Sequence, residues 1–75
     1  MERKHQFTAI LSKEDDHFVA LCPELDIASQ GTTVEEARTN LIEALELFFE
    51  SASPNELRER MHQEVFVTSV EVKVA

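Results

Sequence analysis

The chain has 75 residues, and its fifteen acidic and seven basic side chains give a formal net charge of −8. This length allows one domain, residues 1–75, whose core is so small that association with another chain is the expected source of extra stability. The acidic excess argues against direct binding to nucleic acid, whose phosphates need Lys and Arg, and it permits a basic protein partner.

The start of the chain is charged and is not followed by a long apolar run, so no signal peptide is predicted. No apolar stretch approaches the roughly 20 residues of a membrane span. Cys22 is the only cysteine, which excludes an internal disulfide and favours a reducing compartment. We therefore expect a soluble, cytoplasmic protein.

Three strands are predicted in the first half of the chain, at 5–12, 17–22 and 27–30, where β-forming residues cluster or alternate with polar ones. Residues 13–16 form a polar turn, in which Asp tolerates the backbone geometry, so the first two strands should pair as an antiparallel hairpin. Pro23 ends the second strand because proline cannot donate to a sheet ladder.

A long amphipathic helix is predicted from Thr33 to about Glu50. Gly31 frees the backbone for the preceding turn, and Thr33 with Glu36 has the spacing of a capping box. The apolar face comprises Val34, Ala37, Leu41, Ala44, Leu45 and Phe48, flanked by Ile42 and Phe49. The opposite face carries Glu35, Glu36, Glu43, Glu46 and Glu50. Leu47 falls on this polar side, where either packing under the following segment or contact with a partner would explain it.

A second, short helix follows, with Ser53 as its cap, Pro54 at the first helical position and Glu56 reaching back, and it should end near His62. Residues 64–75 predict a last strand, with Phe66, Val70, Val72 and Val74 on one side and Ser69, Glu71 and Lys73 on the other. Natural proteins avoid an exposed apolar edge, so we expect a homodimer or higher homo-oligomer built on this strand. The expected interface residues are Val65, Val67, Val70, Val72 and Val74.

These elements predict a single α+β domain of two layers, in the order β-β-β-α-(α)-β, with the long helix packed on one face of the sheet. A helical crossover makes the last strand parallel to the strand it joins. Placing it beside the first strand gives the sheet order 3-2-1-4.

The stretch from Phe18 to Ala37 resembles the HicB-like antitoxin family, through a strand ending in CPEL, a short strand ending in SQG, and T-x-E-E-A opening an amphipathic helix. The resemblance covers nearly the whole chain from Phe7 onward. It implies a partial ribonuclease-H-like sheet. It also implies an antitoxin of a type II toxin-antitoxin system, which neutralises a small basic RNA-cleaving toxin of the HicA type by stoichiometric binding. Many family members carry a C-terminal DNA-binding domain, and we expect this chain to be a short member without one.

The sequence does not predict an enzyme. Two-metal nuclease chemistry needs converging carboxylates on rigid elements, and the first predicted strand carries none. His5 and His17 flank the first hairpin and could approach each other to bind a metal, but they lack metal-site spacing, and surface positions explain them better. Cys22 and His17 are five residues apart and so point to opposite faces of a strand. We expect no catalytic residue, cofactor or metal site; a degenerate nuclease is the disfavoured alternative.

The expected partner-binding residues are Glu14, Asp15, Asp16, Glu24 and Asp26, which have no lysine or arginine between them. An acidic domain can imitate the charge of RNA and steer a basic partner onto itself. The alternative for each single acid is an ordinary solvated side chain. The alternative function for the whole chain is a stand-alone oligomeric protein-interaction module with no toxin partner.

Overall fold

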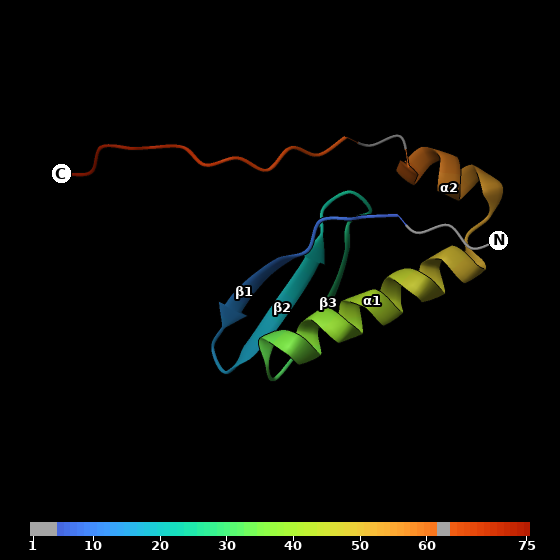
Figure 1. The fold of residues 1–75 in the computed structure, drawn as a ribbon, viewed down its shortest axis with the longest axis horizontal. Helices are drawn as coiled ribbons and strands as arrows, with labels where there is room; N and C mark the ends of the chain where they lie inside the picture. The colour runs from blue at the N-terminus through green and yellow to red at the C-terminus, as the bar shows by residue number, and fades with distance from the viewer. Residues whose placement is uncertain (1–4, 62–63) are drawn as a thin grey trace.

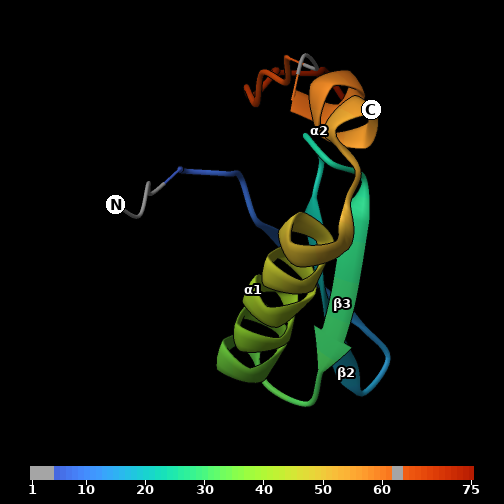
Figure 2. The same cartoon turned by 90° about the vertical axis from the view of Figure 1, so that its right-hand side faces the viewer.

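The computed structural model describes residues 5–61 and 64–75 and has an α+β architecture in two layers (Figures 1 and 2). One layer is an antiparallel sheet in the order β1-β2-β3, made of β1 (Ile10–Glu14), β2 (His17–Cys22) and β3 (Ile27–Gly31). The other layer is α1 (Val34–Ser51), which covers one face of the sheet, and α2 (Pro54–Met61) follows it. The predicted order of three strands and two helices is confirmed.

The hairpin between β1 and β2 is tighter than the sequence predicts. β1 begins later, at Ile10, and continues to Glu14, which pairs with His17. Only Asp15 and Asp16 remain in the turn, and Asp15 has a φ of 52°. This left-handed conformation is one that Asp adopts more readily than most residues, so the two-residue turn forms and the ladder extends into the segment predicted as a loop.

The core lies between α1 and the face of the sheet that carries Phe18, Ala20 and Cys22 of β2. Its buried members are Ala20, Cys22, Leu25, Ala37 and Leu41. Partly buried side chains pack against them: Phe7, Leu11, Phe18, Ile27, Leu45, Phe48 and Phe49. The apolar face that the helical period predicts therefore packs against the alternate residues of β2 that point toward it.

The α1 helix begins as the sequence predicts, with one shift. The hydroxyl of Thr33 accepts the backbone N–H of Glu36 at 3.0 Å, as an N-cap should. The Glu36 carboxylate, however, accepts the backbone N–H of Thr32 at 2.9 Å, one residue before the partner that a capping box uses. Both contacts satisfy backbone donors at the start of the helix.

Gly31 is required for close packing, and the expectation that it frees the backbone is wrong. Its φ is not positive, so any residue could adopt its conformation. A Cβ atom added there would lie 2.5 Å from the backbone nitrogen of Ala37 and 2.9 Å from the carbonyl carbon of Glu36. The absence of a side chain is what lets α1 lie directly against the end of β3.

The α2 helix has the complete capping box that the sequence predicts. Ser53 Oγ accepts the backbone N–H of Glu56 at 3.2 Å, and the Glu56 carboxylate accepts the backbone N–H of Ser53 at 3.3 Å. At its other end, Arg60 donates to the carbonyl oxygen of Leu25 and lies 5.8 Å from the centre of the Phe48 ring. Arg60 thereby joins α2 to the β2–β3 connection.

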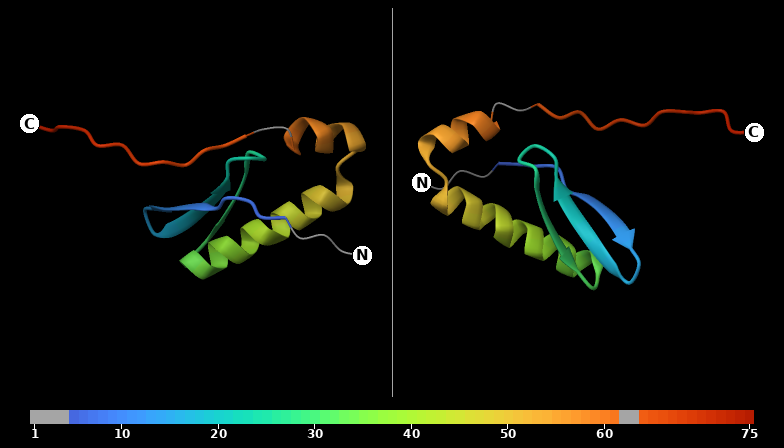
Figure 3. Two further views of the ribbon diagram at one scale, coloured as in Figure 1. Left: turned by 45° about the horizontal axis from the view of Figure 1, so that its top comes forward. Right: turned by 180° about the vertical axis from the view of Figure 1, so that it is seen from behind.

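Residues 64–75 do not form the predicted strand. This segment, which we call the C-terminal segment, is extended and runs from the side of α2 past the sheet without joining it (Figures 1 and 3). The predicted order 3-2-1-4 is therefore present only as its first three strands. The prediction fails for a physical reason: a strand forms only when its backbone groups pair with another strand, and this segment runs past the three-stranded sheet without pairing with it.

Candidate protein-binding site

The five acids predicted to bind a partner lie in two groups at opposite ends of β2. Glu14, Asp15 and Asp16 lie at the β1–β2 turn, whereas Glu24 and Asp26 lie in the β2–β3 connection. β2 has six residues, so about 20 Å separates the two groups at about 3.3 Å per residue. A partner would not meet them as one continuous patch.

Glu24 makes contacts within the chain. Its carboxylate accepts the backbone N–H of Thr8 at 3.0 and 3.1 Å and the Thr8 hydroxyl at 2.7 Å. Desolvation by burial raises the pKa of Glu24, but the hydrogen bonds from the Thr8 hydroxyl and from backbone N–H groups outweigh it, so the net pKa is lowered. Glu24 therefore anchors the segment that precedes β1.

Cys22 is fully buried beside Glu24, with its Sγ atom 3.5 Å from the Glu24 carboxylate. Burial is the main cause of a raised pKa of the Cys22 thiol, and the neighbouring carboxylate adds to it. A buried neutral thiol is a poor nucleophile and packs as a small apolar side chain.

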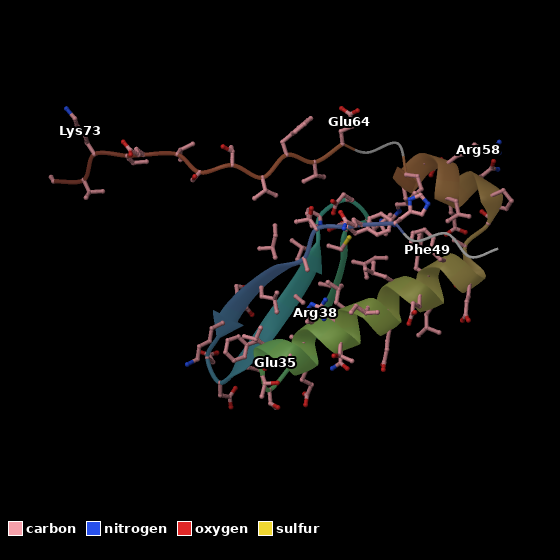
Figure 4. All side chains as sticks on the ribbon, in the orientation of Figure 1. Glu35, Arg38, Phe49, Arg58, Glu64 and Lys73 are labelled. Carbon is pink, nitrogen blue, oxygen red and sulfur yellow. The ribbon has the colours of Figure 1, made fainter. Side chains whose placement is uncertain are left out.

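The first acidic group gains a further member from the helix. Phe18 pairs with Gly31, so the β1–β2 turn lies at the same end of the sheet as the start of α1. Glu35, in the first turn of α1, lies at this same end of the molecule (Figure 4). We call the exposed carboxylates of Glu14, Asp15, Asp16 and Glu35 the acidic tip.

The outer face of α1 carries a second acidic feature. Glu43, Glu46, Leu47 and Glu50 recur at the spacing of one helix face and together line a shallow depression. The side chain of Leu47 is 62 % exposed, so it does not pack under the segment that follows α1, and that explanation of its position is wrong. We call these four residues the α1 stripe. It places one apolar side chain among three carboxylates.

A groove that the sequence does not predict runs along the other side of α1. It lies between residues 5–9 and the helix, and its apolar lining includes Phe7, Ile42, Leu45 and Phe49. The rings of Phe7 and Phe49 lie 5.6 Å apart, centre to centre, and close one part of it. We call it the β1-side groove. Its only signal in the sequence is the width of the apolar helix face, because Ile42 and Phe49 lie beside the main stripe.

The histidines do not form a site within the described residues. His17 lies at the turn, with Nδ1 3.7 Å from an Asp16 carboxylate oxygen. His5 lies beyond the other end of β1, its ring centre 6.3 Å from that of Phe7, so the two do not meet across the hairpin. His62 is outside the described residues. Over residues 5–61 and 64–75, no three His, Cys, Asp or Glu side chains gather as potential metal ligands.

Neither helix in the described part of the chain is long and apolar enough to cross a bilayer.

Among known proteins, the chain is similar to a UPF0150 protein of Synechocystis sp., with 47 % identity over 49 residues. The match covers 63 % of this chain and 62 % of that protein, so the chain spans less than two thirds of its relative's length. No protein-family model and no solved structure matches the chain.

Proposed function

We propose that this protein is a HicB-like antitoxin, which neutralises a small basic HicA-type RNA-cleaving toxin by stoichiometric binding and catalyses no reaction. The observation that carries the proposal is the α1 stripe, in which the exposed Leu47 lies among Glu43, Glu46 and Glu50. The residue pattern from Phe18 to Ala37 supplies the family, and the similarity to a UPF0150 protein is compatible with an antitoxin-type family.

The chemistry of the α1 stripe suits a basic protein partner. Its three carboxylates attract Lys and Arg over long distances and increase the rate of encounter. Leu47 then provides an apolar contact that loses its water only when a complementary surface covers it. Anchors of this kind, surrounded by polar side chains, contribute most of the free energy of binding in protein interfaces. The acidic tip adds to the attraction from the end of the domain.

The same proposal implies a location in the cytoplasm. It also implies a sheet of four strands. An RNA-cleaving toxin acts in the cytoplasm, so its antitoxin is placed there as well. A HicB-like chain has a partial ribonuclease-H-like sheet of order 3-2-1-4, in which a strand from residues 64–75 would lie beside β1. The free edge of β1 leaves room for such a strand.

The test begins with the neighbouring reading frames. A small basic protein encoded directly beside this gene is the candidate toxin, and its expression should stop growth. Co-expression of this chain should restore growth, and the two proteins should elute together at a fixed stoichiometry in size-exclusion chromatography. If co-expression of this chain restores growth with none of the small basic neighbours, and none of them binds the chain, the antitoxin assignment is wrong.

Two matched pairs of variants locate the binding surface. Leu47→Ala should weaken the complex by about tenfold, because it removes an anchor worth roughly 1.5 kcal/mol, whereas Val34→Ala, at another exposed apolar position of α1, should not. Glu43→Lys should slow association and reduce its dependence on salt, whereas Glu59→Lys, on the exposed surface of α2, should have little effect. Equal effects within each pair would place the toxin elsewhere on the chain.

The alternative function, a stand-alone oligomeric interaction module, is favoured by one observation, the large exposed apolar side chains of the C-terminal segment. A gene with no basic neighbour, combined with stable self-association of the purified chain, would support this alternative over the antitoxin.

A further inference from the structure

The C-terminal segment exposes an unusual amount of apolar surface. Phe66, Val70, Val72 and Val74 are between 74 % and 88 % exposed, and Val67 is 65 % exposed. On an extended backbone the first four lie on one side, and Ser69, Glu71 and Lys73 lie on the other. An apolar row of this kind, interrupted only at Thr68, indicates a surface that another element covers.

The β1 edge of the domain has the complementary property. β1 pairs only with β2 in the described sheet, so the outward-facing backbone groups of β1 have no ladder partner there. α1 lies mainly over β3 and β2 and barely reaches β1. The apolar face of the helix consequently extends past the sheet into the β1-side groove, where Ile42 is 41 % exposed. One further strand beside β1 would cover it.

We propose that the C-terminal segment of one copy adds to the β1 edge of a second copy, beneath the β1-side groove, and that the exchange is reciprocal. Phe66, Val70, Val72 and Val74 then pack against Phe7, Ile42, Leu45 and Phe49 of the other copy. The backbone N–H and C=O groups of the added strand form hydrogen bonds with the unpaired backbone groups at the edge of β1. The order 3-2-1-4 is completed between two chains, and the two-fold exchange leaves neither copy with an open groove.

The occupant is a second copy because of the path that the C-terminal segment takes. Arg60 holds α2 against the carbonyl of Leu25, at the β2–β3 connection. From there the segment runs outward past the sheet, and Phe66 is already 86 % exposed near its start (Figure 3). Lys73 lies far from the body of the domain, and Phe49 lies at the other end of the view in Figure 4. The segment thus extends toward space that another chain would occupy.

The size of the contact also suits a dimer. Each copy offers the twelve residues of 64–75 and a groove lined by twelve residues. Together these match the roughly 20–30 residues per partner of a stable interface. The chain itself, with its small core, gains the burial that one copy alone lacks.

The first test compares variants of the full chain by analytical ultracentrifugation over a range of concentrations. Val70→Glu and Ile42→Glu should each raise the dimer dissociation constant by about tenfold or more, because both bury a carboxylate in an apolar contact. Ser69→Glu and Leu47→Glu add the same charge on the opposite side of the segment and of α1, and they should leave dimerisation nearly unchanged.

Each outcome decides the proposal. A wild-type chain that is monomeric at roughly 100 µM overturns it, because this concentration exceeds any useful dissociation constant. Dissociation by Val70→Glu but not by a folded Ile42→Glu also overturns it, since two segments would then pair with each other rather than with the groove. Circular dichroism establishes that each variant retains its helices.

A synthetic peptide of residues 64–75 removes the dependence on folded variants. Added in excess to the wild-type chain, it should occupy the groove and convert the dimer into monomer with bound peptide. The same peptide carrying Val70→Glu should fail to do so. A wild-type peptide that neither binds nor shifts the dimer would contradict strand exchange.

Discussion

The carboxylate of Glu24 holds Thr8, sixteen residues earlier in the chain, by accepting both its backbone N–H and its hydroxyl. The contact fixes the segment before β1, which forms one wall of the β1-side groove. An acid that the sequence places among possible partner contacts is thus also part of the domain's internal structure.

Removing this contact should destabilise the domain. Thr8→Val leaves the Glu24 carboxylate without its shortest hydrogen bond, and we expect it to lower the free energy of unfolding by about 1–2 kcal/mol. Thr39→Val, on the exposed side of α1, is the control and should be close to neutral. Urea unfolding followed by circular dichroism gives both values. A similar small loss in the two variants would mean that the hydrogen bond from the Thr8 hydroxyl to Glu24 contributes nothing to stability.

The Glu24 carboxylate should make the free energy of unfolding depend on pH in the acidic range. The folded pKa of Glu24 lies below its ordinary value of 4.5, so the unfolded state binds a proton more readily. Its contribution is therefore fully present above pH 4.5 and is lost as the pH falls through the lower, folded pKa. Glu24→Gln should flatten the pH dependence of the melting temperature below about pH 4.5. A curve parallel to that of the wild type would exclude this role.

Gly31→Ala should strongly destabilise the protein. The new methyl group would overlap backbone atoms of Ala37 and Glu36, which cannot move without displacing α1. Overpacking of this kind costs about 1–3 kcal/mol. Gln30→Ala, at the adjacent exposed position, should be nearly neutral. Thermal unfolding of the two variants checks the prediction, and a Gly31→Ala protein as stable as the wild type would contradict the close approach of helix and strand.

Arg60→Met should loosen α2 while leaving the sheet and α1 intact. Arg60 connects α2 to Leu25 and Phe48, whereas Arg58 donates only locally, to Asn55 at 2.5 Å. Amide hydrogen exchange in α2 should become several-fold faster in Arg60→Met and change little in Arg58→Met. Equal protection of α2 in both variants would show that Arg60 does not hold the helix.

Cys22 should resist thiol reagents in the folded protein. Its burial and raised pKa both keep it from forming an accessible thiolate, so its labelling should follow unfolding. A Thr39→Cys variant supplies an exposed thiol in the same chain for comparison. Labelling of Cys22 by a disulfide reagent at pH 8 should be slower by orders of magnitude than that of the added thiol. Comparable rates would contradict the buried environment.

Local chemistry explains which elements could be predicted from the sequence. The cap at Thr33 and the capping box from Ser53 to Glu56 involve neighbours in the chain, and both are present. Pro23 follows the last residue of β2, and the apolar period of α1 marks the face that packs on the sheet, although Val34, at the start of that face, is exposed. These features depend on interactions within a few residues, so their signals are written in consecutive positions.

Contacts between distant residues decided the rest. The sequence draws attention to Gly31, Glu24 and Leu47, but only the packed fold shows their roles. Gly31 allows close packing, Glu24 anchors Thr8, and Leu47 is exposed. The valines of residues 64–75 predict a strand, yet a strand exists only where another edge satisfies its backbone. Propensity along the chain therefore determined the elements, and the spatial arrangement of partners determined which surfaces are covered and which are left for another molecule.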